Sequence, residues 1–157
     1  MSDANFNITD IPAISTTDLT DFTSWTPTGT WVDNTTYSGF YKLVGDLMVA
    51  NFKILTTGNP TSTHLIIDMP TGFIIDVTKI TSDLFTHAGN LVIYDDDTTG
   101  KYSGDLIIAS TSTLSAYAFN ASGTYLTHST ITQAIPITFV ADDYIVGQFI
   151  VPWTVAP

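Results

Sequence analysis

The chain has 157 residues and a formal net charge of −11; 44% of its residues are hydrophobic and 12% are charged. This apolar content excludes an intrinsically disordered acidic tail, because such tails lack the apolar surface that offsets the entropy of ordering. The negative charge and the absence of arginine exclude nucleic acid as a partner, since few groups could neutralise phosphates or read a guanine edge. No apolar stretch approaches the ~20 residues of a membrane span, so no membrane partner is expected.

The residue types favour strands over helices. All 15 acidic residues are Asp, all four basic residues are Lys, and Thr occurs 28 times. Asp favours turns and caps, whereas Thr, Val, Ile and aromatic residues suit the pleated surface of a sheet. The sequence also has no cysteine, which excludes disulfides and thiolate chemistry. These features predict an all-β fold, and the length predicts one domain.

Residues 1–25 are expected to form an extended N-terminal arm, because they contain isolated apolar residues without a period of 3.6 or 2. The apolar side chains of this arm need a surface to cover, and they are the candidate partner-binding residues: Phe6, Ile8, Ile11 and Ile14. The remaining residues, 26–157, are expected to form a β-sandwich domain.

From Trp25 onward, short β-type runs alternate with turn residues, which is the pattern of an antiparallel, jelly-roll-like β-sandwich. Turns are expected at Gly45-Asp46, at Pro70-Thr71-Gly72 and at Asp97 to Gly100. The expected strands are 28–33, 38–44, 46–56, 63–68, 73–77, 84–94, 102–109, 113–119, 124–128, 135–140 and 144–152.

Two of these runs predict how the sheet is covered. Residues 47–55 alternate, so that Met48, Ala50, Phe52 and Ile54 should face a dry core while Val49, Asn51, Lys53 and Leu55 face a wetter side. The run 144–152 is more uniformly apolar. It is expected to be buried on both faces of the sheet or against a partner subunit.

Three short motifs follow one another in the first half of the chain. Trp25-Thr26-Pro27 comes first, then Tyr41-Lys42-Leu43-Val44-Gly45-Asp46, then Asp68-Met69-Pro70-Thr71-Gly72 followed by Ile75-Asp76. Their order resembles that in β-sandwich modules of bacteriophage capsid-decoration (cement) proteins and tail-fibre tips. The pattern in that family is an aromatic residue before Val-Gly-Asp, a strand, and later Leu-Pro-x-Gly before an Ile-Asp pair. Met69 replaces the usual Leu, and the resemblance covers about a third of the chain.

The resemblance implies a jelly-roll-like sandwich, a homotrimer and a structural role on the virion surface, with no enzymatic chemistry. The first hypothesis is a cement protein that binds the major capsid protein or another virion protein and stabilises the phage head. The alternative is a tail-fibre or head-fibre tip that binds a host receptor, such as a glycan.

The three tryptophans, Trp25, Trp31 and Trp153, are candidates for the trimer interface or for other aromatic contacts. Aromatic side chains are enriched at subunit interfaces, and they also stack on sugar rings. The interface is the favoured interpretation, and sugar stacking stays open.

One acidic loop overlays the first half of a calcium loop. Asp95, Asp97 and Thr99 supply oxygens at its first, third and fifth places, with Gly100 at the sixth. The twelfth place holds Leu106 where a bidentate Glu belongs. A solvated hairpin turn is therefore favoured, no cofactor is expected, and calcium is kept as a weak possibility.

No motif for catalysis stands out. His64, His87 and His128 lack the spacing of a metal site, and no Gly-x-Ser-x-Gly elbow is present to hold a nucleophile. The sequence therefore predicts no catalytic residues and no enzyme.

Overall fold

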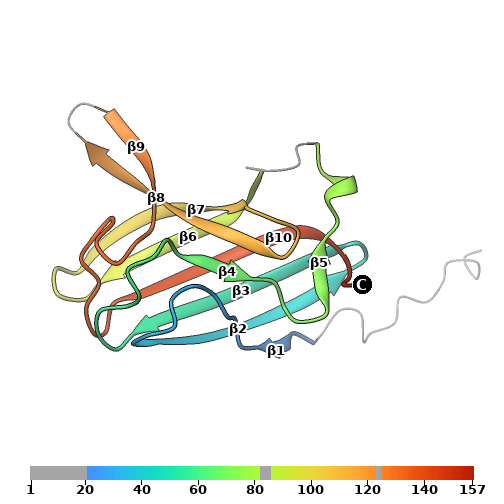
Figure 1. The fold of residues 1–157 in the computed structure, drawn as a ribbon, viewed down its shortest axis with the longest axis horizontal. Helices are drawn as coiled ribbons and strands as arrows, with labels where there is room; N and C mark the ends of the chain where they lie inside the picture. Colours follow the sequence, from blue (N-terminus) through green and yellow to red (C-terminus); the bar gives the residue numbers. More distant parts are fainter. Residues whose placement is uncertain (1–20, 82–85, 123–124) are drawn as a thin grey trace, which may run out of the picture.

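The structure is a computed structural model that describes residues 21–81, 86–122 and 125–157. The arm residues Phe6, Ile8, Ile11 and Ile14 lie outside the described residues. The described elements are ten strands and a short 3₁₀ helix (Figure 1): β1 (Thr23–Trp25), β2 (Thr35–Val44), β3 (Leu47–Thr56), β4 (Ile66–Asp68), β5 (Phe73–Ile75), η3 (Val77–Lys79), β6 (His87–Asp95), β7 (Gly100–Ile108), β8 (Thr113–Ser122), β9 (Tyr125–Thr130) and β10 (Tyr144–Val155).

The strands pair antiparallel in one continuous path, β1-β2-β3-β10-β6-β7-β8-β4, with β5 paired to β10 and β9 to β8. Hairpins join β2 to β3 and β6 to β7, as the turn residues predict, and Gly45 has a positive φ of 57° in the first of these turns. β10 comes last in the sequence but lies between β3 and β6, so the end of the chain joins the two halves of the sheet.

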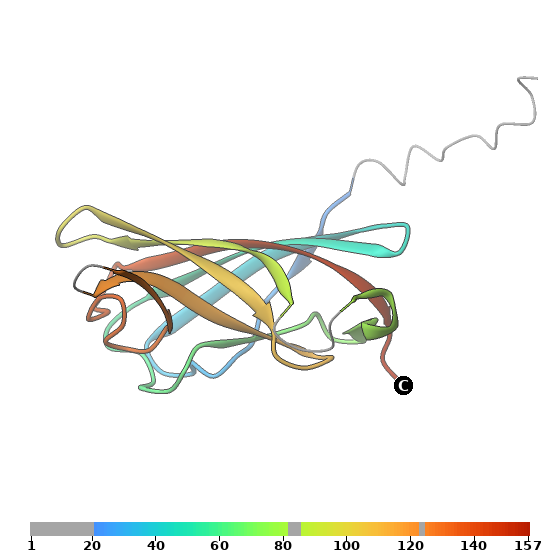
Figure 2. The same ribbon diagram turned by 90° about the horizontal axis from the view of Figure 1, so that it is seen from above.

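The two ends of this path meet, so the sheet curls around its own core. The segment between β1 and β2 forms a bridge from Gly29 to Ile67 of β4. Two backbone hydrogen bonds flank it, from Thr30 N to Ile66 O at 3.1 Å and from Asp68 N to Thr28 O at 2.9 Å. Figure 2 shows the resulting layers seen from above. The all-β, antiparallel class is confirmed, while the jelly-roll-like sandwich stays a prediction.

The curled sheet encloses one apolar core. The alternation expected in residues 47–55 is confirmed, since Met48, Ala50, Phe52 and Ile54 are buried. Across the core, Trp31 packs edge-to-face on Phe139 with ring centroids 5.0 Å apart. The largest fully buried side chains include Trp31, Phe139, Phe149, Met48, Ile54, Leu65, Ile67 and Ile75.

Two expected strands are not strands in the structure. Over 28–33, only Gly29 makes a β-bridge. Side chains rather than backbone N–H groups bond the neighbouring carbonyls here: Trp31 Nε1 donates to Thr63 O at 2.9 Å, and Thr30 Oγ1 donates to His64 O. Over 135–140, only Ile135 makes a bridge, to Thr132. Both segments still supply core residues. Their apolar side chains are therefore explained by burial in the core and not by strand pairing.

Ordered sheet begins within the range expected to be the arm. Residues 23–25 form β1, in which Trp25 pairs with Gly39 of β2 and meets Phe149 edge-to-face at 6.0 Å. Among the described residues, no helix is long and apolar enough to cross a membrane.

Candidate functional site

The candidate site is the outer face of the strands β2, β3, β10 and β6. Registered pairs place side chains from these strands in rows across this face. One row contains Phe40, Asn51, Gln148 and Asn90, and the next contains Ser38, Lys53, Val146 and Val92. The opposite face of the same strands carries the core, so these outward residues are free for contact with a ligand or partner.

The outer face is hollowed because glycines on the inner face let the sheet sink toward the core. Gly147 and Gly104 flank Leu91 in one inward row. A Cβ at Gly147 would lie 2.3 Å from the Phe52 ring, and one at Gly104 would lie 2.0 Å from the Tyr117 carbonyl oxygen. Glycine permits such close backbone approach and bends a sheet. Figure 2 shows the β2–β3 and β6–β7 hairpins rising at opposite ends of this layer.

The hollow is an open groove of about 520 Å³, which we call the central groove. Ligand sites commonly have volumes of about 300–1,000 Å³. Its outward-facing side chains are those of Ser38, Phe40, Asn51, Lys53, Asn90, Val92, Val146 and Gln148.

Three of the four lysines lie on this face, which also carries Asp105 of β7, registered opposite Asn90. Lys42, Lys53 and Lys101 lie at outward positions of β2, β3 and β7, and only the fourth lysine, Lys79, lies elsewhere. Lys53 Nζ lies 4.5 Å from the centroid of the Tyr144 ring, which stacks on Tyr94 with centroids 4.4 Å apart. Such cation–π contacts hold the ammonium groups in place while leaving them exposed to a ligand.

Beside the groove, toward the β2–β3 turn, lies an apolar strip made of Val44, Leu47, Val49 and Ile150. Register places Val44 opposite Leu47, and Val49 opposite Ile150. Val44 is 52% exposed, Leu47 45% and Ile150 48%. Contiguous exposed apolar residues of this kind mark contact surfaces.

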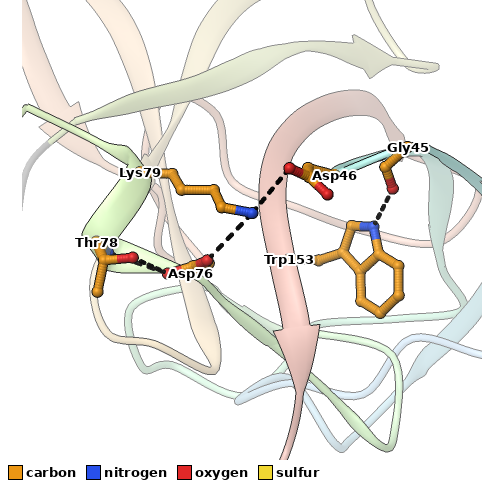
Figure 3. A network of polar contacts seen from close by, with 6 residues as sticks. All are labelled: Gly45, Asp46, Asp76, Thr78, Lys79 and Trp153. Atoms are coloured by element: carbon orange, nitrogen blue, oxygen red, sulfur yellow. Dashed lines mark hydrogen bonds and ion pairs between the residues drawn. The ribbon is translucent and has the colours of Figure 1, made fainter.

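The same end of the sheet brings together two of the three motifs singled out in the sequence (Figure 3). Lys79 Nζ lies 2.9 Å from Asp46 Oδ2 and 3.5 Å from Asp76 Oδ2, so it joins the Val-Gly-Asp turn to the Ile-Asp pair. Trp153 Nε1 donates to Gly45 O at 3.1 Å. The motif residues therefore form a structural corner that fixes the β2–β3 turn beside β5 and the end of β10.

The carboxylate of Asp76 is held in its charged form by this corner. Thr78 donates to Asp76 Oδ1 from its hydroxyl at 2.6 Å and from its backbone N–H at 3.2 Å. These hydrogen bonds, with the side-chain hydroxyl contributing most, and the nearby Lys79 lower the pKa of Asp76. Lys79 has a raised pKa, mainly because it donates to Asp46.

The acidic loop is a hairpin turn between β6 and β7. Asp95 accepts hydrogen bonds from Thr98, at 3.1 Å from its N–H and 2.7 Å from its hydroxyl, and Thr99 has a positive φ of 56°. Within residues 21–81, 86–122 and 125–157, no group of three or more His or Asp side chains is placed to hold a metal ion. Calcium at Asp95, Asp97 and Thr99 stays a prediction.

Two of the histidines come closer together than their spacing in the sequence indicates. His87 Nε2 lies 3.3 Å from Asp105 Oδ1, and His128 Nε2 lies 3.7 Å from Asp105 Oδ2. His64 instead meets the Tyr117 ring at 5.6 Å. These contacts tie β6, β7 and β9 together at the edge of the outer face.

The three tryptophans have different surroundings. Trp31 is completely buried, and its aromatic contact lies within the core, against Phe139. Trp25 and Trp153 are half-buried, and their roles at an interface stay predictions. Trp153 also packs edge-to-face on Phe73 at 5.2 Å.

Sequence reasoning missed the central groove and its amide row. The alternation in β3 gave the outward positions of Asn51 and Lys53, but not the strands beside them. The signal that could have located β10 was the apolar run 144–152, which was expected to be buried on both faces of the sheet or against a partner subunit. Within the chain only one face of it is covered, since Ile145 and Phe149 are buried while Ile150 is exposed.

Comparisons of the chain with protein-family models, with curated proteins and with solved structures found no match.

Proposed function

We propose that this chain is a non-catalytic structural protein of a bacteriophage particle, a capsid-decoration protein that forms a homotrimer on the virion surface. The observation that carries the proposal is the apolar strip of Val44, Leu47, Val49 and Ile150 on a rigid sheet. The order of the sequence motifs, which resembles that in capsid-decoration and fibre-tip modules, supports the same assignment. The partners are other copies of the chain and the major capsid protein or another virion protein.

The strip is suited to permanent contact rather than to exposure. Fully burying one large aliphatic side chain contributes about 1.5–3 kcal/mol, and the exposed members of the strip are already half covered. Its contribution is therefore a few kcal/mol before the costs of association, which suits a contact repeated around a trimer or lattice. The arm, with Phe6, Ile8, Ile11 and Ile14, would add further anchors on a neighbouring protein.

The strip is tested by introducing charge into it. Leu47→Asp combined with Ile150→Asp should convert the trimer to a monomer in light scattering and abolish co-sedimentation with phage particles. Val32→Asp is the matched control, because Val32 is 74% exposed and lies outside the strip. A wild-type chain that is monomeric at high concentration and does not bind particles would refute the proposal.

The second candidate is a fibre tip that binds a host receptor, and the central groove is the observation that favours it. Deleting residues 1–20 separates the two functions while leaving β1 and Trp25 in place. A decoration protein should lose particle binding after this deletion, whereas a receptor-binding tip should still bind host cells.

A further inference from the structure

We propose that the central groove is a carbohydrate-binding site that takes an acidic oligosaccharide. This inference goes beyond a structural role in the virion and does not depend on it. It is carried by three properties of the groove: a row of side-chain amides, an apolar floor with one exposed aromatic ring, and a lysine that has no acidic partner among the described residues.

The amide row provides the polar recognition. Gln148 is registered opposite Asn51 on one side and Asn90 on the other. Neighbouring strands are about 5 Å apart, so the three amides cover about 10 Å across the sheet, comparable to a disaccharide. Each amide carries both donors and an acceptor, which is the combination that pairs with sugar hydroxyls.

The amides are available to a ligand. The Asn51 and Gln148 side chains are exposed and make no hydrogen bond to other residues in the described part of the chain. Asn90 Oδ1 lies 3.1 Å from His87 Nε2, which orients it and leaves its NH₂ group free to donate. The backbone beneath them is fixed by strand pairing on both sides, so the row is preorganised and loses little entropy on binding.

The apolar part of the groove fits the C–H faces of a sugar ring. Phe40 is 53% exposed at one end of the amide row, and Val92 and Val146 lie in the adjacent row. Ligand sites combine such apolar surface with a few well-placed polar groups. A flat apolar partner would instead bury the amides without hydrogen-bond partners, which weakens binding.

Lys53 determines which ligand charge the groove prefers. It borders the groove and forms no ion pair with an acidic side chain among the described residues, and the Tyr144 ring fixes its ammonium group at 4.5 Å. Lys53 lines the same groove as the three amides, so its unpaired ammonium favours a carboxylate-bearing sugar.

The test is titration of the full chain with hexagalacturonate and with its methyl ester, after screening an array of uronic-acid oligosaccharides. Binding should shift the side-chain amide resonances of Asn51, Asn90 and Gln148 in NMR spectra. Asn51→Ala combined with Gln148→Ala should weaken binding roughly tenfold or more, since each hydrogen bond contributes about 1 kcal/mol. Lys53→Gln should remove the preference for the acid over its ester.

The control is Asn59→Ala, which removes an exposed amide outside the groove and should leave affinity unchanged. Circular dichroism would confirm that each variant folds. The proposal is overturned if no acidic oligosaccharide binds, if binding survives loss of both amides, or if the ester binds as well as the acid. The variant with Leu47→Asp and Ile150→Asp should still bind the sugar as a monomer. The experiment therefore distinguishes a failure of the sugar-binding proposal from a failure of the proposed assembly.

Discussion

Asp76 shows how a short sequence motif acts at the scale of single residues. Asp76 directly follows β5. Its carboxylate accepts a hydrogen bond from Thr78 and lies beside Lys79, which also contacts Asp46, some 30 positions earlier in the chain. The Ile-Asp pair thus places a charge where it helps to hold a turn from a distant part of the chain.

We predict that Thr78→Val raises the pKa of Asp76, because the hydroxyl hydrogen bond is the largest cause of its lowered pKa. The pKa of the carboxyl group would be measured by NMR titration in the wild type and in the variant. An unchanged pKa in Thr78→Val would contradict this role of the hydroxyl.

The lowered pKa of Asp76 also determines the direction in which the stability of the fold depends on pH. Because the pKa of Asp76 is lower in the folded state, its contribution to stability is complete above the unfolded value of about 3.9 and is lost as the pH falls through the folded value. Lys79 behaves in the opposite sense: its contribution is present below its unfolded pKa and is lost as the pH rises through the raised folded value.

At the scale of elements, the glycines on the inner face determine the shape of the sheet. Gly147 accommodates the Phe52 ring, and Gly104 lies against the backbone of β8. Without these close approaches the layer would be thicker, and the outer face would not be hollowed above them. The groove is therefore a consequence of residues on the opposite face.

Gly104→Ala should destabilise the fold by about 1–3 kcal/mol or more, because its Cβ would overlap the Tyr117 carbonyl and force strands β7 and β8 apart. Urea denaturation measures this cost. Gly58→Ala is the matched control, since its Cβ would meet Asn34 at an ordinary 3.4 Å and its φ is not positive, so its stability should change little. Equal stability of the two variants would contradict the role given to Gly104.

These elements also show what the sequence could and could not predict. The alternation in residues 47–55 and the turn residues Gly45 and Gly72 were enough to predict β3 and the turns near it, because strand period and turn geometry are local properties. The order of strands is not local. Pairing of β10 with both β3 and β6 decides which outward residues adjoin, so the amide row could not be assembled from the sequence alone.

Trp31 illustrates the same limit for a single side chain. Its neighbours Val32 and Asp33 are exposed, and nothing in the local pattern distinguishes it from Trp25 or Trp153. Its burial depends on Phe139, more than 100 residues later, and on the curl that brings the segment before β2 against β4.

At the scale of the whole molecule, charge and apolar contact oppose each other. In the proposed trimer, three copies of a chain with a net charge of −11 would repel one another while the apolar strip holds them together. The lysines on the outer face, Lys42, Lys53 and Lys101, would lessen this repulsion near the strip without cancelling it.

We therefore expect salt to strengthen the trimer. Raising sodium chloride from about 0.1 M to about 1 M shortens the Debye length from about 10 Å to about 3 Å, which screens repulsion between the acidic surfaces while leaving burial of Leu47 and Ile150 intact. Sedimentation equilibrium at the two concentrations measures the dissociation constant, which should fall. If it rises, the copies are held by pairs between lysine and aspartate, and the apolar strip must then face a different partner.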